Sequence, residues 1–120
     1  MIDRELLVEM FDGIAQRGDW DTSQSMLWGF FFTNREPTAL RAAIPKLQAD
    51  EYEFVDVFQS EKNSPSDPDL WWLHVQRVEV HTVDTLFARN ERLTEFASRN
   101  GIDSYDGMDV GLPPMGARPV

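Results

Sequence analysis

The stretch MLWGFFFT at residues 26–33 decides the fold of this chain. It is aromatic-rich, short and bounded by turn formers, which is typical of a strand buried on much of both faces. Gly29 inside it indicates the close approach of another backbone, or a bulge. We therefore expect residues 26–33 to form a central strand of a sheet.

The segment that follows this strand predicts a helix and then another strand. Pro37 suits a first helical position, and apolar residues recur on one face up to Leu47. Pro45 conflicts with this helix, because proline removes a backbone donor, and it predicts a kink or an early end. In residues 52–59, Phe54 and Phe58 flank Asp56 on one side while Val55 and Val57 share the other, which predicts a strand.

A polar loop at 60–69 separates that strand from its predicted hairpin partner at 70–81. The inward parity changes along this second strand, because apolar residues shift from odd to even positions. A bulge near Gln76 and Arg77 would reconcile the two halves.

The remaining elements follow from capping signals. Thr82 is expected to cap a helix that Gly101 closes in a left-handed turn, and residues 104–110 predict an edge strand. Upstream, apolar spacing from Ile2 to Ile14 predicts an N-terminal helix. The chain thus predicts an α+β fold: a ferredoxin-like split β-α-β sandwich, with a four-stranded antiparallel sheet, helices on one face and an extra N-terminal helix.

Length and composition indicate one domain. The 120 residues fit a single domain at 1–111, followed by a Pro/Gly-rich tail at 112–120 that we expect to be flexible. There is no Cys, which excludes a disulfide framework. The N-terminus lacks a signal-peptide pattern, and the longest apolar run is too short to span a bilayer, so we expect a cytoplasmic protein.

The net charge of −10, from 21 acidic and 11 basic residues, favours a basic protein partner. A protein with this negative charge repels the phosphate backbone of a nucleic acid, so direct nucleic-acid binding is disfavoured. The alternative is that the acidity only aids solubility.

Candidate catalytic and ligand-binding residues do not assemble into a recognisable site. His74 and His81 have odd spacing, so they point to opposite faces of a regular strand and could share a site only across the bulge predicted between them. The spacing of Asp103, Asp106 and Asp109 does not match a calcium-binding loop. Glycine-rich phosphate loops and a serine nucleophile elbow are also missing from the sequence. We therefore expect no cofactor, no metal and no enzymatic activity.

Two adjacent tryptophans, Trp71 and Trp72, lie in a predicted strand, so one points inward and the other outward. An outward Trp on the face that helices leave uncovered is either part of a partner-binding hot spot or shielded by the N-terminal helix.

The segment 97–107, ASRNGIDSYDG, resembles the ending of the regulator of ribonuclease E activity B family, in which a helix runs into a Tyr-Asp-Gly-Trp turn. The order of elements from Ser25 onward is also similar. The resemblance implies a small acidic ferredoxin-like domain that inhibits the endoribonuclease by binding the enzyme itself, with no catalytic residues. Met108 stands where the family usually has Trp, and a Pro/Gly-rich tail replaces an acidic one.

Three functions remain open from the sequence. The first is a bacterial regulator that docks on a partner enzyme and inhibits it. The second is an immunity protein that neutralises a basic toxin, and the third is a small enzyme or ligand-binding domain that uses His74 or His81. For partner binding the candidate residues are Asp50, Glu51, Glu53, Asp56, Trp72, Tyr105 and Asp106, of which Tyr105 and Asp106 are expected to be structural, the first in the core and the second bonded to turn amides.

Overall fold

The computed structural model describes residues 2–18 and 20–116, and within them the predicted order of elements is confirmed. None of the helices in these ranges is long and apolar enough to cross a bilayer. The helices and strands are α1 Arg4–Arg17, β1 Met26–Asn34, α2 Pro37–Ala49, β2 Glu53–Gln59, β3 Trp71–Glu79, α3 Val83–Arg99 and β4 Ser104–Gly111.

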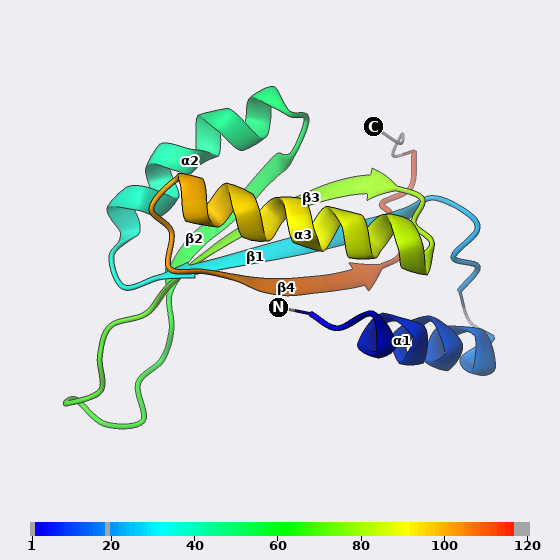
Figure 1. The fold of residues 1–120 in the computed structure, drawn as a ribbon, viewed down its shortest axis with the longest axis horizontal. Helices are drawn as coiled ribbons and strands as arrows, with labels where there is room; N and C mark the ends of the chain where they lie inside the picture. Colours follow the sequence, from blue (N-terminus) through cyan, green and yellow to red (C-terminus); the bar gives the residue numbers. More distant parts are fainter. Residues whose placement is uncertain (1, 19, 117–120) are drawn as a thin grey trace.

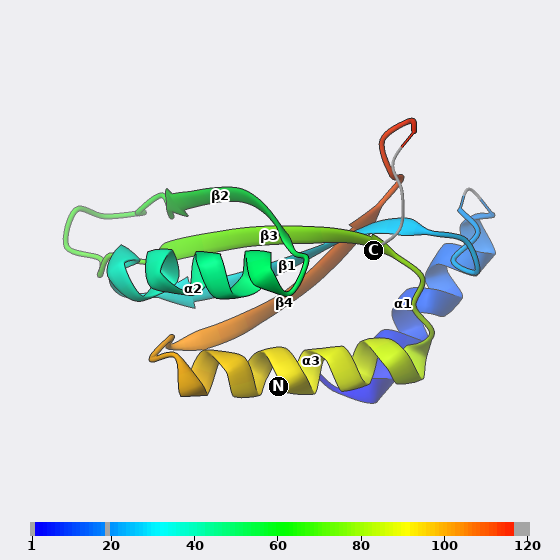
Figure 2. The ribbon, with the colours of Figure 1, turned by 90° about the horizontal axis from the view of Figure 1, so that it is seen from above.

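The strands form one antiparallel sheet in the order β2-β3-β1-β4. β1 lies between β3 and β4, which confirms its predicted central position. Helices α2 and α3 cover the same side of the sheet, and α1 is added beside them (Figure 1). Within the described residues, Figure 2 shows no helix over the other side. This is the predicted ferredoxin-like split β-α-β arrangement.

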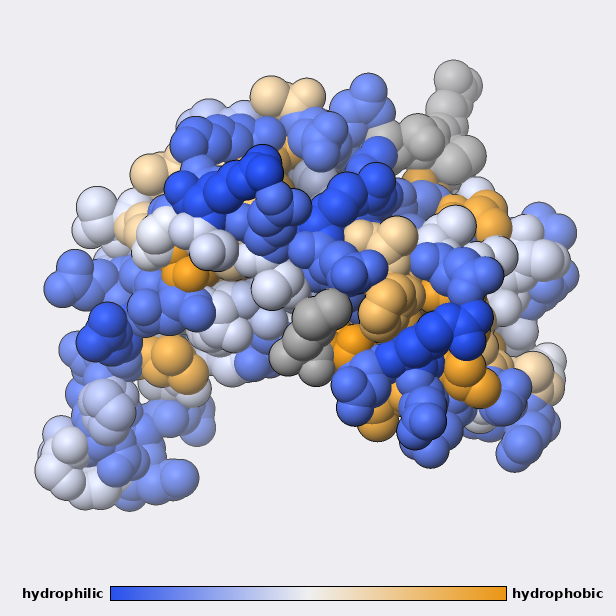
Figure 3. Space-filling view, in the orientation of Figure 1, coloured by the Kyte–Doolittle hydropathy of each residue, from blue (hydrophilic) through white to orange (hydrophobic). Residues whose placement is uncertain are grey.

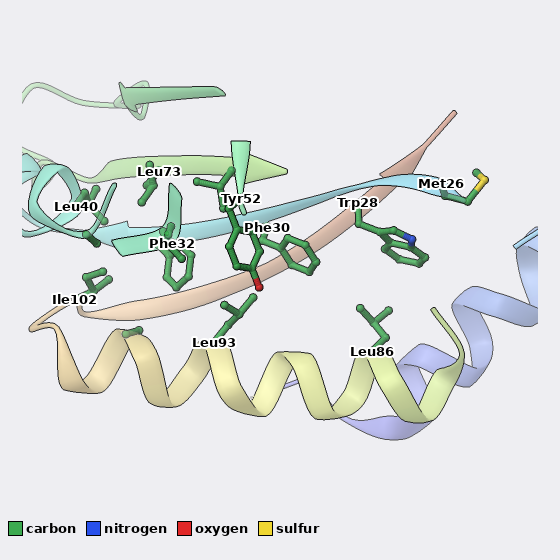
Figure 4. Packing of buried hydrophobic residues seen from close by; sticks show 14 of the residues in the cluster. Met26, Trp28, Phe30, Phe32, Leu40, Tyr52, Leu73, Leu86, Leu93 and Ile102 are labelled. Atoms are coloured by element: carbon green, nitrogen blue, oxygen red, sulfur yellow. The ribbon is translucent and has the colours of Figure 1, made fainter. Parts of the chain in front are cut away.

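The core lies between the sheet and the helices because alternate residues of β1 point toward α3 (Figure 4). Trp28, Phe30 and Phe32 have no exposed surface. They pack against Leu86 and Leu93, which lie on the inner face of α3. Each large apolar side chain buried in this way contributes roughly 1.5–3 kcal/mol to the free energy of folding.

Helix α1 packs against α3 and the adjacent end of the core. Leu7 is completely buried, and the ring of Phe11 lies 6.0 Å from that of Trp28. The guanidinium of Arg4 is 2.5 Å from the carboxylate of Asp84, at the start of α3. The N-terminal helix therefore lies on the helix-covered side and does not cover the opposite sheet face.

The predicted bulge near Gln76 and Arg77 is wrong, since β3 pairs with β1 in continuous register from Trp71 to Glu79. The parity change was inferred from apolar residues alone. In the structure the inward positions continue through Arg77 and Glu79, whose charged groups are mostly buried and close to one another. Val80 is 49% exposed, so this apolar side chain does not belong to the inner face of the sheet.

Register irregularities occur instead in the two edge strands. In β2, Val55 has no partner between Phe54 and Asp56, so these two residues face opposite sides of the sheet. In β4, Asp106 is the additional residue between Tyr105 and Gly107. Bulges are frequent in edge strands, where they redirect side chains.

Two further expectations are corrected by side-chain packing. Helix α2 continues through Pro45 to Ala49, with Leu47 beyond the proline buried, so the early end is wrong and the kink stays a prediction. At Gly29 no other backbone makes the close approach. The atoms nearest to the position that a Cβ would take are side-chain atoms of Asp109 and His74.

The tail predicted at 112–120 is described only in part. Residues 112–116 contain no helix or strand, and the last four residues lie outside the described ranges. β4 ends at Gly111, and both the domain boundary at 111 and the flexibility of the tail stay predictions.

Candidate protein interface

The side of the sheet opposite the helices carries a group of aromatic rings. We call this side the open face. The rings of Phe31 and His74 stack with centroids 4.3 Å apart, and those of Phe58 and Trp72 stack at 6.2 Å with nearly parallel planes. Phe31 meets Trp72 edge-on at 6.2 Å, which joins the two pairs. The open face is defined by Phe31, Phe58, Trp72 and His74 together with the carboxylates of Glu53, Asp56, Asp106 and Asp109.

Strand pairing explains why these rings meet. Phe31 lies opposite His74 on β3, and Phe58 of β2 lies opposite Trp72. Directly opposed side chains on one face of a sheet have Cβ atoms only about 5 Å apart. Residues distant in sequence therefore form a continuous aromatic surface across three strands.

A shallow cavity of about 690 Å³ extends from this surface toward the edge strands. Its lining includes Phe31, Phe58 and Trp72, with the acidic residues Glu61 and Asp106 at its border. Phe58 remains 39% exposed, which is high for a large apolar side chain. Exposed aromatic surface with a polar border is typical of a binding site for another protein.

Four of the seven predicted partner-binding residues lie on the open face. Asp56 is opposite His74, and Glu53 accepts a hydrogen bond of 2.8 Å from Gln76 Nε2. Trp72 belongs to the aromatic group, and α1 does not shield it. Asp106 is exposed on the bulge of β4, and we find no bond from its carboxylate to turn amides within the described residues.

The other three residues lie elsewhere. Asp50 follows the end of α2 on the helix-covered side, and Glu51 occupies the next turn with a φ of 68°. Tyr105 packs on Phe32 and donates a hydrogen bond of 2.5 Å to Asn90 Oδ1. Burial raises the pKa of its hydroxyl, so the group is neutral. Tyr105 thus has the structural position that was expected of it.

The two histidines lie on opposite sides of the sheet. His81 is buried on the helix side, where its ring contacts Glu79 Oε2 at 2.8 Å and Thr85 Oγ1 at 3.0 Å. His74 stacks on the open face, and neither ring lines the cavity there. In the described ranges, no three His, Asp or Glu side chains are arranged to hold a metal ion.

His74 and Asp109 flank Gly29 on the open face, a grouping that the sequence did not predict. Burial lowers the pKa of His74, although the negative charges of Asp109 and Asp56 oppose that shift. The ring is therefore neutral near pH 7 and acts as an aromatic surface. In the sequence, Gly29 was the available indication of this grouping, because a residue without a side chain leaves room for its cross-strand neighbours.

Fold and surface together define a small α+β domain whose sheet is accessible to a partner from one side. Comparison with known families identifies it further. The family model described as "Regulator of ribonuclease activity B" matches residues 5–110, and the chain belongs to this family. The predicted resemblance is thereby confirmed. A search of the curated proteins finds no match, and neither does a search of the solved structures.

Proposed function

We propose that this protein regulates a ribonuclease by docking its open face on a basic segment of that enzyme and inhibiting it. Family membership supports the regulation of ribonuclease activity. The observation that carries the docking mode is the aromatic group on an otherwise acidic sheet face. Ribonuclease E is the enzyme that the resemblance implies, and a bacterial cytoplasm is where the two proteins would meet.

The charge of the open face supports a cationic partner. Carboxylates at four strand positions surround the rings of Phe31, Phe58 and Trp72. None of the described strand residues that point to this side is Lys or Arg. Arginine suits such a surface best, because its planar guanidinium stacks on aromatic rings while it pairs with carboxylates. An arginine-containing segment of the enzyme is therefore the proposed occupant.

Family membership also separates the earlier alternatives. The regulator of a ribonuclease has the support of the family match, whereas the immunity protein has no comparable support. The enzymatic alternative required a polar cavity around a histidine. His74 instead contributes its ring to the aromatic surface, and His81 is enclosed by Glu79, Thr85 and Trp28.

Replacement of Trp72 by alanine tests the docking mode. We expect W72A to weaken binding to purified ribonuclease E by at least about tenfold in calorimetric titrations, and to reduce inhibition of RNA cleavage in parallel. The matched control is Leu6→Ala, which removes an apolar side chain, 55% exposed, from α1. This control should bind like the wild type.

Salt dependence and a second variant make this test decisive. Raised ionic strength should weaken wild-type binding, because exposed charge pairs are screened. Asp106→Asn, at an exposed position, should also weaken binding and should not disturb folding. Equal affinity for wild type, W72A and D106N, or binding unaffected by salt, would contradict the proposed surface.

A further inference from the structure

The cations of this acidic protein are unevenly distributed. Five of its 11 Lys and Arg residues line one cavity of about 480 Å³ between α2 and α3. In the same orientation as Figure 1, Figure 3 shows a strongly hydrophilic surface over these two helices. The cavity is on the helix-covered side, away from the open face. Its cationic residues are Lys46, Arg77, Arg89, Arg92 and Arg99.

The deeper part of this cavity holds two guanidinium groups that share one carboxylate. Arg89 forms two hydrogen bonds with Glu79, of 2.7 and 3.1 Å. Arg77 Nε is 3.6 Å from the same carboxylate, and this buried atom has no hydrogen-bond partner among the described residues. His81 also contacts Glu79. The single negative charge of Glu79 is therefore shared by two permanent cations, Arg77 and Arg89.

The deeper part keeps a net positive charge although Glu79 is ionised, because its two guanidiniums outnumber this one carboxylate. Burial alone would raise the pKa of Glu79, but hydrogen bonds from His81 and Arg89 and the charge of Arg89 lower it to about 2. Burial raises the pKa of the Tyr52 hydroxyl, which stays protonated and can donate. The Tyr52 side chain extends from just before β2 toward Leu93 of α3 (Figure 4).

The rim of the cavity adds three exposed cations from the two helices. Lys46 of α2 donates a hydrogen bond of 2.6 Å to the neutral Asn100 Oδ1. Arg99 pairs with Glu95, one turn earlier in α3. Arg92 has no ion pair within the described residues. The lining contains two carboxylates, those of Asp50 and Glu95, against five cations.

We propose that this cavity binds a compact phosphorylated anion that carries one or two phosphate groups. Guanidinium groups match phosphate oxygens in geometry, and several of them suit a ligand with more than one negative charge. The volume falls in the range of small-molecule sites, roughly 300–1,000 Å³. A long polyanion is disfavoured, because the net charge of −10 repels it outside the cavity.

Calorimetric titration of the full chain with inorganic pyrophosphate at constant ionic strength tests this proposal. We expect saturable binding by the wild type. The double variant Lys46→Gln/Arg92→Gln, which changes two exposed side chains, should bind at least about tenfold more weakly. The matched control is Arg41→Gln on α2, which removes an exposed cation outside the cavity and should change affinity less than about twofold.

Three results would overturn the proposal: no saturable binding by the wild type, equal binding by the double variant, or an equal loss in R41Q. A short single-stranded oligoribonucleotide provides a further arm. Tighter binding of this RNA than of pyrophosphate through Lys46 and Arg92 would show that the ligand is a nucleic acid and not a compact anion. W72A should bind pyrophosphate like the wild type, since Trp72 lies on the other side of the sheet.

Discussion

At the scale of single residues, Gly29 links the fold to the open face. A Cβ at this position would lie 2.8 Å from His74 Nε2 and closer still to the carboxylate of Asp109. We expect Gly29→Ala to lower the free energy of unfolding by about 1 kcal/mol, because the stacked imidazole has to move. Chemical denaturation measures this change.

Gly13 is the matched control for that substitution. It lies within α1, and no atom is within 4 Å of the position of its Cβ. Gly13→Ala should therefore raise the free energy of unfolding, by up to about 1 kcal/mol, because alanine favours the helix. A G29A protein as stable as the wild type would show that the space above Gly29 is not needed.

The sequence predicted individual residues best where the signal was local. The alternation of Trp71 and Trp72 follows from their own strand, whereas the close backbone or bulge expected at Gly29 is wrong. The proximity of His74 and Asp109 depends on the pairing of β1 with both β3 and β4. Strand pairing is a property of the tertiary fold, so the spacing of residues in the sequence did not predict that His74 and Asp109 lie close together.

At the scale of elements, the start of α3 offers a direct test of local structure. The Thr82 side chain accepts a hydrogen bond of 3.2 Å from the Thr85 amide, and the Thr85 hydroxyl accepts one of 2.8 Å from the Thr82 amide. Thr82→Ala should lower the free energy of unfolding by about 1 kcal/mol. Thermal or chemical unfolding measures it.

Ser98 supplies the control, as an exposed hydroxyl near the other end of α3. Ser98→Ala should stay within about 0.5 kcal/mol of the wild type. Equal stabilities of T82A and S98A would mean that the cap at Thr82 contributes nothing.

Capping residues made the helices predictable, whereas pairing made the strands harder to predict. Thr82, Pro37 and Gly101 mark helix boundaries through their own backbone chemistry, and Gly101 has the expected left-handed φ of 68°. The bulges at Val55 and Asp106 depend on the partner strand. Buried ion pairs also explain why the bulge predicted in β3 is wrong, because Glu79 lies at an inward position that an apolar pattern does not anticipate.

At the scale of the whole molecule, the net charge of −10 is an average over two different surfaces. Carboxylates surround the aromatic open face, while five cations gather between α2 and α3. The sequence correctly predicted the sheet architecture and its acidic character. The separation of charges arises only when the hairpin and the helices pack, so composition alone indicated either a basic partner or better solubility, and it did not predict the cationic cavity.

The four Trp side chains allow the docking mode to be measured directly. In ¹⁵N–¹H spectra each indole N–H gives its own signal, and Trp72 lies on the open face. Trp28 is the internal control, because its buried indole donates to the Glu79 carbonyl on the helix side, at 3.2 Å. Addition of unlabelled ribonuclease E should shift or broaden the Trp72 signal well beyond the Trp28 signal. Complex formation with the Trp72 signal unchanged would contradict docking through the open face.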